Sequence, residues 1–158
     1  TLSELQRELD QLLHQPVSFK RIAGNSIIIY FFGEPGDSNV VSIFNHTSWR
    51  YQKHGKVVLG SYDLLIDEDD FDSTEEYEQR FDHLCSLTDD LCNAELLACW
   101  VDPESSDLTL KFSNGQVIRN FANSAFDNTR WTYRNMPKQI RAHVSPSGVE
   151  IEIAEKEQ

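Results

Sequence analysis

The feature of this sequence that most constrains its fold is a short aromatic pattern that occurs twice, at a constant offset of 82 residues. The segments HTSWRY and NTRWTY share three residues in the same order: Thr47, Trp49 and Tyr51 in the first, and Thr129, Trp131 and Tyr133 in the second. A repeat of this length is too long for a solenoid unit, and stacked arrays need about three or more copies. The pattern therefore predicts two similar halves that share one core.

Each copy of the pattern follows two apolar runs that are rich in β-forming residues. The four runs are residues 26–32, 40–44, 107–112 and 117–121. Turn residues separate them at 33–39 and at 113–115, so we expect two hairpins. Residues 56–61 and 139–144 each follow a copy of the pattern and would supply a closing strand. The run 27–32 is apolar on both faces and should form a central strand.

Two segments have the periodicity of amphipathic helices. Residues 2–13 carry leucines at helical spacing, with Ser3 and a following Glu near the start. Residues 73–87 follow a cap at Ser73 or Thr74. Four apolar side chains line one face of this second segment: Tyr77, Phe81, Leu84 and Leu87. One helix therefore opens each half.

These elements predict an α+β fold with two similar halves, each a helix followed by antiparallel strands. The chain has 158 residues, enough for one domain that buries its own core. We assign residues 1–158 to a single domain. Within it, a pseudo-repeat of residues 1–64 and 73–153 is joined by the acidic segment 65–72.

Acidic side chains are concentrated in one part of the chain. Between Tyr62 and Leu108 there are sixteen acids and one base, Arg80, which leaves ten acids and thirteen bases elsewhere. The net charge of −12 is thus a local excess of −15 set against a remainder of +3. Such a segment repels nucleic acid and attracts cationic surfaces, so we expect no direct nucleic-acid binding.

Composition and cysteine usage indicate a folded protein of the cytoplasm. The chain is 39% hydrophobic and 11% aromatic, which is more than a disordered chain of this charge would carry. Cys85, Cys92 and Cys99 are odd in number and closely spaced, which favours reduced thiols over a disulfide framework. No stretch approaches the ~18 apolar residues of a membrane span, and no apolar leader is evident, so we expect no membrane association.

No residue pattern predicts a metal site, a cofactor or a catalytic centre. A calcium loop that began at Asp70 would lack both the turn glycine and the bidentate acid at its end. His83, Cys85 and Cys92 lack the paired short spacings of a zinc site. The glycines are isolated and form no phosphate-binding loop. We therefore expect no metal, no cofactor and no enzymatic activity.

Aromatic and basic residues gather around the repeated pattern. Trp49, Trp100 and Trp131 could form a stacking platform, but a Trp at the same place in each half is what a duplicated core would keep. We therefore expect core packing. Seven basic residues near the two Trp segments could form a weak positive face: Arg50, Lys53, Lys56, Arg130, Arg134, Lys138 and Arg141.

The segment DLTLKFSNGQVIRNF, the repeated W-x-Y pattern and the small acidic character of the chain resemble small bacterial immunity proteins. These belong to contact-dependent growth inhibition and other polymorphic toxin systems. The likeness covers about half of the chain. It implies an inhibitor in the cytoplasm that binds and neutralises the toxic domain of a secreted effector, often a nuclease. It transfers no individual binding residue.

The acidic segment suits this role, because nuclease clefts are cationic and a carboxylate cluster steers association by charge. Phe71 and Tyr77, embedded among the acids, are candidate apolar anchors. The predicted partner-binding residues are Asp67, Glu68, Asp69, Asp70, Phe71, Asp72, Glu75, Glu76, Tyr77 and Glu78. The predicted partner is a basic protein, namely a toxin domain.

Three alternatives stay open. A small-molecule-binding or regulatory α+β module without catalysis would use a pocket between the two halves. An enzyme without a familiar motif would have only Asp63, His46, His54 and His143 as acid and base candidates. In the third alternative, the acids only keep the protein soluble and monomeric.

Overall fold

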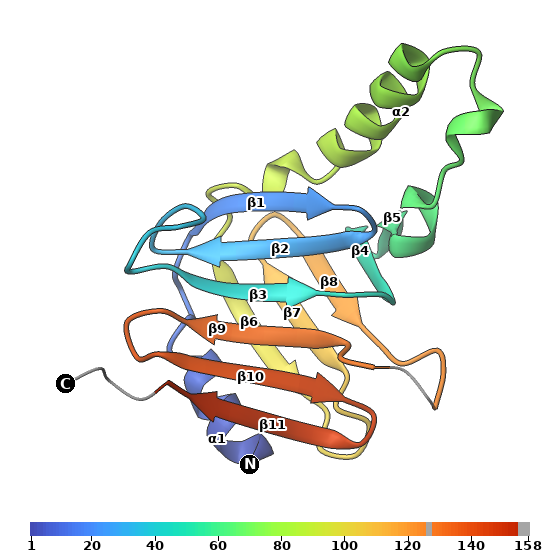
Figure 1. The fold of residues 1–158 in the computed structure, drawn as a ribbon. Coiled ribbons are helices and arrows are strands. Elements are labelled where there is room, and N and C mark those ends of the chain that lie inside the picture. The colour runs from blue at the N-terminus through green and yellow to red at the C-terminus, as the bar shows by residue number, and fades with distance from the viewer. Residues whose placement is uncertain (126–127, 155–158) are drawn as a thin grey trace.

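Two antiparallel β-sheets lie face to face in the computed structural model, which describes residues 1–125 and 128–154 (Figure 1). One has six strands in the order β1-β2-β3-β9-β10-β11, and the other has five in the order β5-β4-β8-β7-β6. The strands are β1 (Val17–Ala23), β2 (Ser26–Phe31), β3 (Val41–Asn45), β4 (Trp49–Lys53), β5 (Lys56–Gly60), β6 (Leu96–Val101), β7 (Leu108–Phe112), β8 (Gln116–Asn120), β9 (Trp131–Asn135), β10 (Ile140–Ser145) and β11 (Gly148–Ile153). The helices are α1 (Leu2–Asp10) and α2 (Thr74–Ser86), with short 3-10 turns at Ser61–Leu64, Glu68–Asp70 and Asp89–Leu91. The α+β class is confirmed, and the chain forms a single domain.

The chain crosses between the sheets twice. Strands β1 to β3 form a meander in the six-stranded sheet, and β4 and β5 then join the five-stranded sheet. Strands β6 to β8 form a meander in the five-stranded sheet, and β9 to β11 return to the six-stranded one. As a result β3 pairs with β9, and β4 pairs with β8. Neither complete sheet can form from one half of the chain alone.

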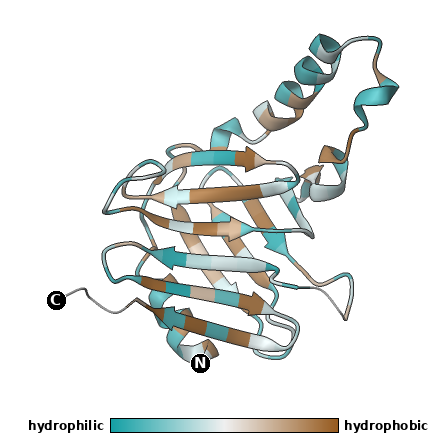
Figure 2. Ribbon diagram, in the orientation of Figure 1, coloured by the Kyte–Doolittle hydropathy of each residue, from teal (hydrophilic) through white to brown (hydrophobic). Residues whose placement is uncertain are grey.

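The core between the sheets is built around two tryptophans. Trp49 and Trp131 begin β4 and β9 and are 1% and 0% exposed, so the predicted core packing is confirmed for both. Their indole N–H groups donate to the carbonyls of Asn25 (2.9 Å) and Ser106 (3.1 Å), so neither buried donor is left unpaired. Trp100, by contrast, is exposed on β6 and lies outside the core. Hydrophobic residues run along the strands of both sheets (Figure 2).

A buried asparagine joins the chain at both crossings. The side-chain amide of Asn120, at the end of β8, is fully buried. It donates to Asn45 Oδ1 at the end of β3 (3.3 Å), to the His46 carbonyl (3.3 Å) and to the Arg130 carbonyl (3.1 Å). His46 begins the β3–β4 crossing and Arg130 ends the β8–β9 crossing. One side chain therefore holds both crossing segments in place.

Helix α1 covers the exposed edge of the five-stranded sheet at β6. Leu5 and Leu9 point into the core. The Gln6 side chain accepts from the backbone N–H of Val101 (3.0 Å) and donates to the carbonyl of Cys99 (3.1 Å), so it satisfies backbone groups that an edge strand leaves free. The helix thus closes an edge that would otherwise invite pairing with another chain.

Residues 65–86, here called the acidic arm, leave the body after β5 and return as α2. Figure 1 shows α2 projecting away from both sheets. Leu84 is the only fully buried residue of α2, and Ile66 and Phe81 are half-buried against the core at the base of the arm. Neither α-helix of the described chain is long and apolar enough to span a membrane. The arm is held by its base and is otherwise surrounded by solvent.

Several predicted elements match the structure and others do not. The two expected hairpins are β2–β3 and β7–β8, and the predicted cap of α2 is Ser73, whose hydroxyl accepts from Glu76 N–H (3.1 Å). The first helix is shorter than residues 2–13: it ends at Asp10, and its cap is Thr1 rather than Ser3. The sequence gives no residue range for strands β1, β6 and β11.

The similarity of the two halves stays a prediction. Each half contributes a three-stranded meander to one sheet and further strands to the other. The halves also differ, because the first ends in two such strands and the second in three. In addition, α1 lies against β6 whereas α2 projects from the body (Figure 1).

We predict that Asn120→Ala will lower the free energy of unfolding by about 2–4 kcal/mol, because it removes a buried donor from three acceptors and leaves a void. Denaturant unfolding monitored by circular dichroism measures this change. Asn39→Ala, in the exposed β2–β3 loop, is the matched control and should change stability by less than about 0.5 kcal/mol. If Asn120→Ala lowered the free energy of unfolding as little as Asn39→Ala, Asn120 would not hold the crossing segments in place.

Candidate functional site

The ten predicted partner-binding residues lie together at the outer part of the acidic arm. Eight of them are acids, and all eight are exposed. Phe71 and Tyr77 are half-buried against each other, with ring centroids 5.8 Å apart in an edge-to-face arrangement. No carboxylate of residues 65–86 forms an ion pair with any residue of the described chain. The structure thus gathers these residues on one projecting element.

Some of these acids also order the arm itself. Asp67 accepts the backbone N–H of Asp69 (2.9 Å), and Glu68 accepts the hydroxyl of Thr74 (3.0 Å). Glu76 accepts the backbone N–H of Asp72 (3.3 Å). Glu75 and Glu76 lie in the first turn of α2, where negative charge is favourable beside unpaired N–H groups. The remaining carboxylates contribute charge rather than internal contacts.

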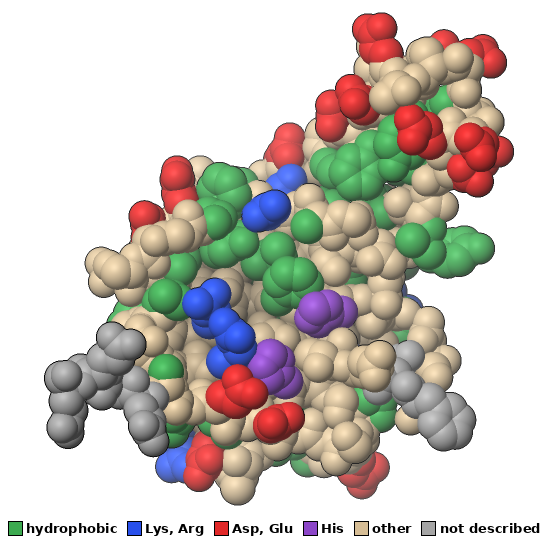
Figure 3. All heavy atoms as spheres, in the orientation of Figure 1, with side chains coloured by type: hydrophobic (Ala, Val, Ile, Leu, Met, Phe, Trp, Pro, Cys, Tyr) green, Lys and Arg blue, Asp and Glu red, His purple; other side chains and the backbone are tan. Residues whose placement is uncertain are grey.

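A second surface, of opposite charge, lies on the outer face of the six-stranded sheet. A cavity of about 600 Å³ opens there between β1, β2, β3, β9 and β10 and the β2–β3 loop. Asp37 is the one acid among the residues that line it. Three arginines and two histidines also line it: Arg21, Arg134, Arg141, His46 and His143. Figure 3 shows the basic and histidine side chains in the middle of this face, with acidic side chains directly beside them and more acids along the distant arm.

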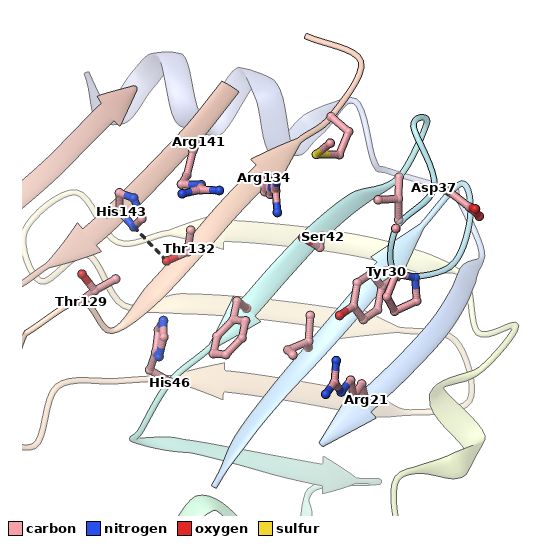
Figure 4. Close-up of a pocket in the computed structure, with 16 residues that line it drawn as sticks. Arg21, Tyr30, Asp37, Ser42, His46, Thr129, Thr132, Arg134, Arg141 and His143 are labelled. Atoms are coloured by element: carbon pink, nitrogen blue, oxygen red, sulfur yellow. Dashed lines mark hydrogen bonds between the residues drawn. The ribbon is translucent and has the colours of Figure 1, made fainter. Parts of the chain in front are cut away.

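Strand alternation explains how the cavity side chains come to the same face. Trp131, Tyr133 and Asn135 of β9 point into the core, so Thr132 and Arg134 point outward. On β10, Ala142 and Val144 point inward, so Arg141 and His143 point outward in the same way. In the register of the two strands, Arg134 lies opposite Arg141 and Thr132 lies opposite His143. Figure 4 shows these two pairs side by side.

The other wall of the cavity is apolar. Ile28, Tyr30 and Val40 are buried on this outer face, with Phe44 and Met136 packed against them. The rings of Phe19 and Tyr30 meet edge to face at 5.7 Å. The cavity therefore has a cationic side on β9 and β10 and an apolar side on β2 and β3.

Two histidines line the cavity. The ring of His46 stacks on Phe44 with centroids 4.3 Å apart. Burial, and to a smaller extent the charge of His143, lowers the pKa of His46 below its ordinary value of 6.5. The Nδ1 atom of His143 lies 3.2 Å from the Thr132 hydroxyl, and its Nε2 lies 3.9 Å from a carboxylate oxygen of Glu152.

Of the four acid–base candidates, the structure brings only His46 and His143 together. Asp63 accepts the backbone N–H of Gly60 (2.8 Å) after β5, and His54 forms the β4–β5 turn. Both lie outside the set of residues that line this cavity.

The expected positive face is only partly present. Arg134 and Arg141 lie at the cavity, whereas Arg130 is fully buried and donates to Asp107 (2.7 Å).

The cysteines and the metal-ligand candidates form no centre in the described chain. Cys85, Cys92 and Cys99 are free, as predicted. Burial raises the pKa of Cys85, and raises that of Cys99 to about 11, so both stay protonated thiols at neutral pH. No group of three or more His, Cys, Asp or Glu side chains within residues 1–125 and 128–154 is placed to hold a metal ion.

We predict that His46 titrates below pH 6.5 in the folded protein, and that His143→Gln raises its pKa only in part, because burial is the larger cause. NMR titration of the imidazole signals measures both values. His83→Gln, on α2, is the matched control and should leave the His46 midpoint unchanged. A His46 pKa at or above 6.5 would contradict the buried placement of this ring.

The same shift predicts a pH dependence of stability. Because the folded-state pKa of His46 is depressed, its neutral form is favoured and stability falls as pH drops below about 6.5. At pH values between the folded-state and unfolded-state pKa of His46, the His46→Gln variant should therefore lose less stability than the unmodified chain. Melting temperatures of both proteins across that range measure the difference, and parallel curves would contradict it.

No family model, no curated protein and no solved structure matches this chain.

Proposed function

We propose that this chain is an immunity-type inhibitor without catalytic activity, which binds and neutralises a basic toxin domain through the acidic arm. One observation carries the proposal. Eight exposed carboxylates lie together on an element that projects from the body, and none forms an ion pair within the described chain. Charges that the fold does not use are available to a partner.

Charge complementarity identifies the kind of partner. A nuclease domain presents a cationic cleft to the phosphate backbone, and a projecting rod of carboxylates can enter such a cleft in place of nucleic acid. Long-range attraction between the two charges would raise the association rate. Because the sheets carry the stability of the fold, the arm can contribute charge without weakening the core.

Affinity requires apolar contacts as well as charge, since exposed charges alone contribute little binding energy. The ring pair of Phe71 and Tyr77 lies among the acids and is only half-buried. In the proposed complex these rings form the desolvated centre of the interface, and the acids form its rim. We also propose that the protein acts in the cytoplasm, because its three thiols are free.

The test compares two variants of equal net charge. The arm variant carries Asp70→Asn, Asp72→Asn and Glu75→Gln, three acids that accept no hydrogen bond within the described chain. The control carries Glu34→Gln, Glu104→Gln and Glu150→Gln, exposed acids elsewhere on the body. Affinity capture from the native cell should yield a basic protein with the unmodified chain and with the control, but much less with the arm variant.

Association and dissociation rates measured with the captured protein test whether charge and the ring pair control the binding. We expect the arm variant to associate about tenfold or more slowly at low salt, and Tyr77→Ala to dissociate faster. The captured protein should also lose its toxic activity when the unmodified chain is added. Equal capture by both triple variants, with association that does not depend on salt, would rule out the arm as the interface.

A second candidate function is binding of a small molecule by a non-catalytic module. The observation that favours it is the 600 Å³ cavity, which has an apolar wall and convergent polar groups. The cavity combines strands β1 to β3 with β9 and β10, so it spans the two halves of the proposed duplication. The two functions use different surfaces and are compatible.

A further inference from the structure

Two arginines of the cavity lie next to each other on adjacent strands. Arg134 and Arg141 are direct cross-strand partners on β9 and β10. Like charges in this position destabilise a sheet. Within the described chain neither guanidinium forms a hydrogen bond or an ion pair. No ion pair or hydrogen bond of the described chain therefore accounts for this pair.

The five-stranded sheet contains a similar pair that is compensated. Arg50 on β4 lies opposite Arg119 on β8. Arg50 lies over the ring of Phe121, 5.5 Å from its centroid, and Arg119 donates to the Thr109 hydroxyl (3.4 Å). Both members of this pair therefore have a partner within the described chain, whereas Arg134 and Arg141 have neither a hydrogen bond nor an ion pair there.

The acids near the cavity do not neutralise Arg134 and Arg141. Asp37 lines the rim, but its carboxylate accepts the backbone N–H of Glu34 (2.8 Å) in the β2–β3 loop. Glu152 on β11 is the cross-strand neighbour of Arg141, yet the basic group within 4 Å of its carboxylate is His143. Neither acid forms an ion pair with Arg134 or Arg141 in the described chain.

We propose that this cavity binds a small organic anion, with its carboxylate or phosphate group between Arg134 and Arg141 and a flat apolar group against Ile28 and Phe44. The inference makes the second candidate function specific and does not depend on the acidic arm. Planar guanidinium groups suit carboxylate and phosphate oxygens because each can donate two parallel hydrogen bonds.

The order of side chains across the sheet fits one orientation of the ligand. One row runs Phe19, Tyr30, Ser42, Arg134, Arg141 and Glu152, and the next runs Arg21, Ile28, Phe44, Thr132, His143 and Glu150. The arginine pair belongs to β9 and β10, and the apolar residues between it and β1 belong to β2 and β3. A single arginine, Arg21, lies at the β1 end of the second row. The anionic end would therefore lie over β9 and β10, within reach of the Ser42 hydroxyl, and the apolar end over β2 and β3 (Figure 4).

The size of the hollow is also suitable. Its volume of about 600 Å³ lies within the range of sites that hold metabolite-sized molecules. A second hollow of about 410 Å³ adjoins it, and Arg134, Met136 and Arg141 line both. The arginine pair thus stands where the two hollows meet and is accessible from either side.

Three naphthalene compounds test the proposal by calorimetric titration of the full chain: naphthoate, naphthyl phosphate and the neutral naphthamide. We expect both anions to bind and naphthamide to bind at least about tenfold more weakly, because it makes no charge-assisted bond. Tighter binding of naphthoate would identify a carboxylate ligand, and tighter binding of naphthyl phosphate a phosphorylated one.

Two double variants, each of which removes two arginine charges from one sheet, test where naphthoate binds. Arg134→Gln with Arg141→Gln should weaken naphthoate binding about tenfold or more. Arg50→Gln with Arg119→Gln removes the same charge from the other sheet and should leave it unchanged. Without ligand, the first variant should melt at the same temperature as the unmodified chain or higher, because repulsion between the two guanidinium groups is gone.

Several results would overturn the proposal. These are no saturable binding of either anion up to about 1 mM, equal binding of naphthoate and naphthamide, or equal loss in the two double variants. If the variant with Arg134→Gln and Arg141→Gln does not fold, the unmodified chain still tests the proposal, because naphthoate should bind to it more tightly than naphthamide. Naphthoate binding by the acidic-arm variant should be normal, which separates this proposal from the inhibitor function.

Discussion

The pairing of β3 with β9 and of β4 with β8 is the constraint on which the rest of this structure depends. Each pair joins one half of the chain to the other, so the two sheets form together. Because the chain must leave one sheet and enter the other at both crossings, buried backbone groups there need partners. The Asn120 side chain supplies them. The cavity on the outer face exists only because β9 and β10 lie beside β3.

The same architecture separates two surfaces of opposite charge. The acids gather on an arm that the sheets do not need, whereas the arginines and histidines gather on the outer face of the sheet that both halves build (Figure 3). The net charge of −12 hides this separation, since the cationic face is small and local. The two proposed functions, binding of a basic protein and binding of a small anion, therefore use sites that do not overlap.

The sequence predicted local features better than it predicted what the fold brings together. Residues 26–32 and 40–44 became the β2–β3 hairpin, and Trp49 and Trp131 became core, because apolar alternation and turn residues act over short distances. Helix α1 ended early and Trp100 was exposed, since tertiary contacts decide both. The ten arm residues lie close together in the sequence, between residues 67 and 78, and could be grouped. Arg134 and Arg141 were noted as basic, but their pairing depends on strand register, which a sequence does not display.

Native-state hydrogen exchange tests most directly the central claim that the crossing strands form one cooperative unit and that the acidic arm lies outside it. Amides of β3, β4, β8 and β9 should exchange with the same free energy, equal to that of global unfolding. Amides in the first turns of α2 should exchange much faster, because this part of the helix buries little apolar surface. Different free energies for the two sheets, or protection of the outer part of α2 equal to that of β9, would contradict the account.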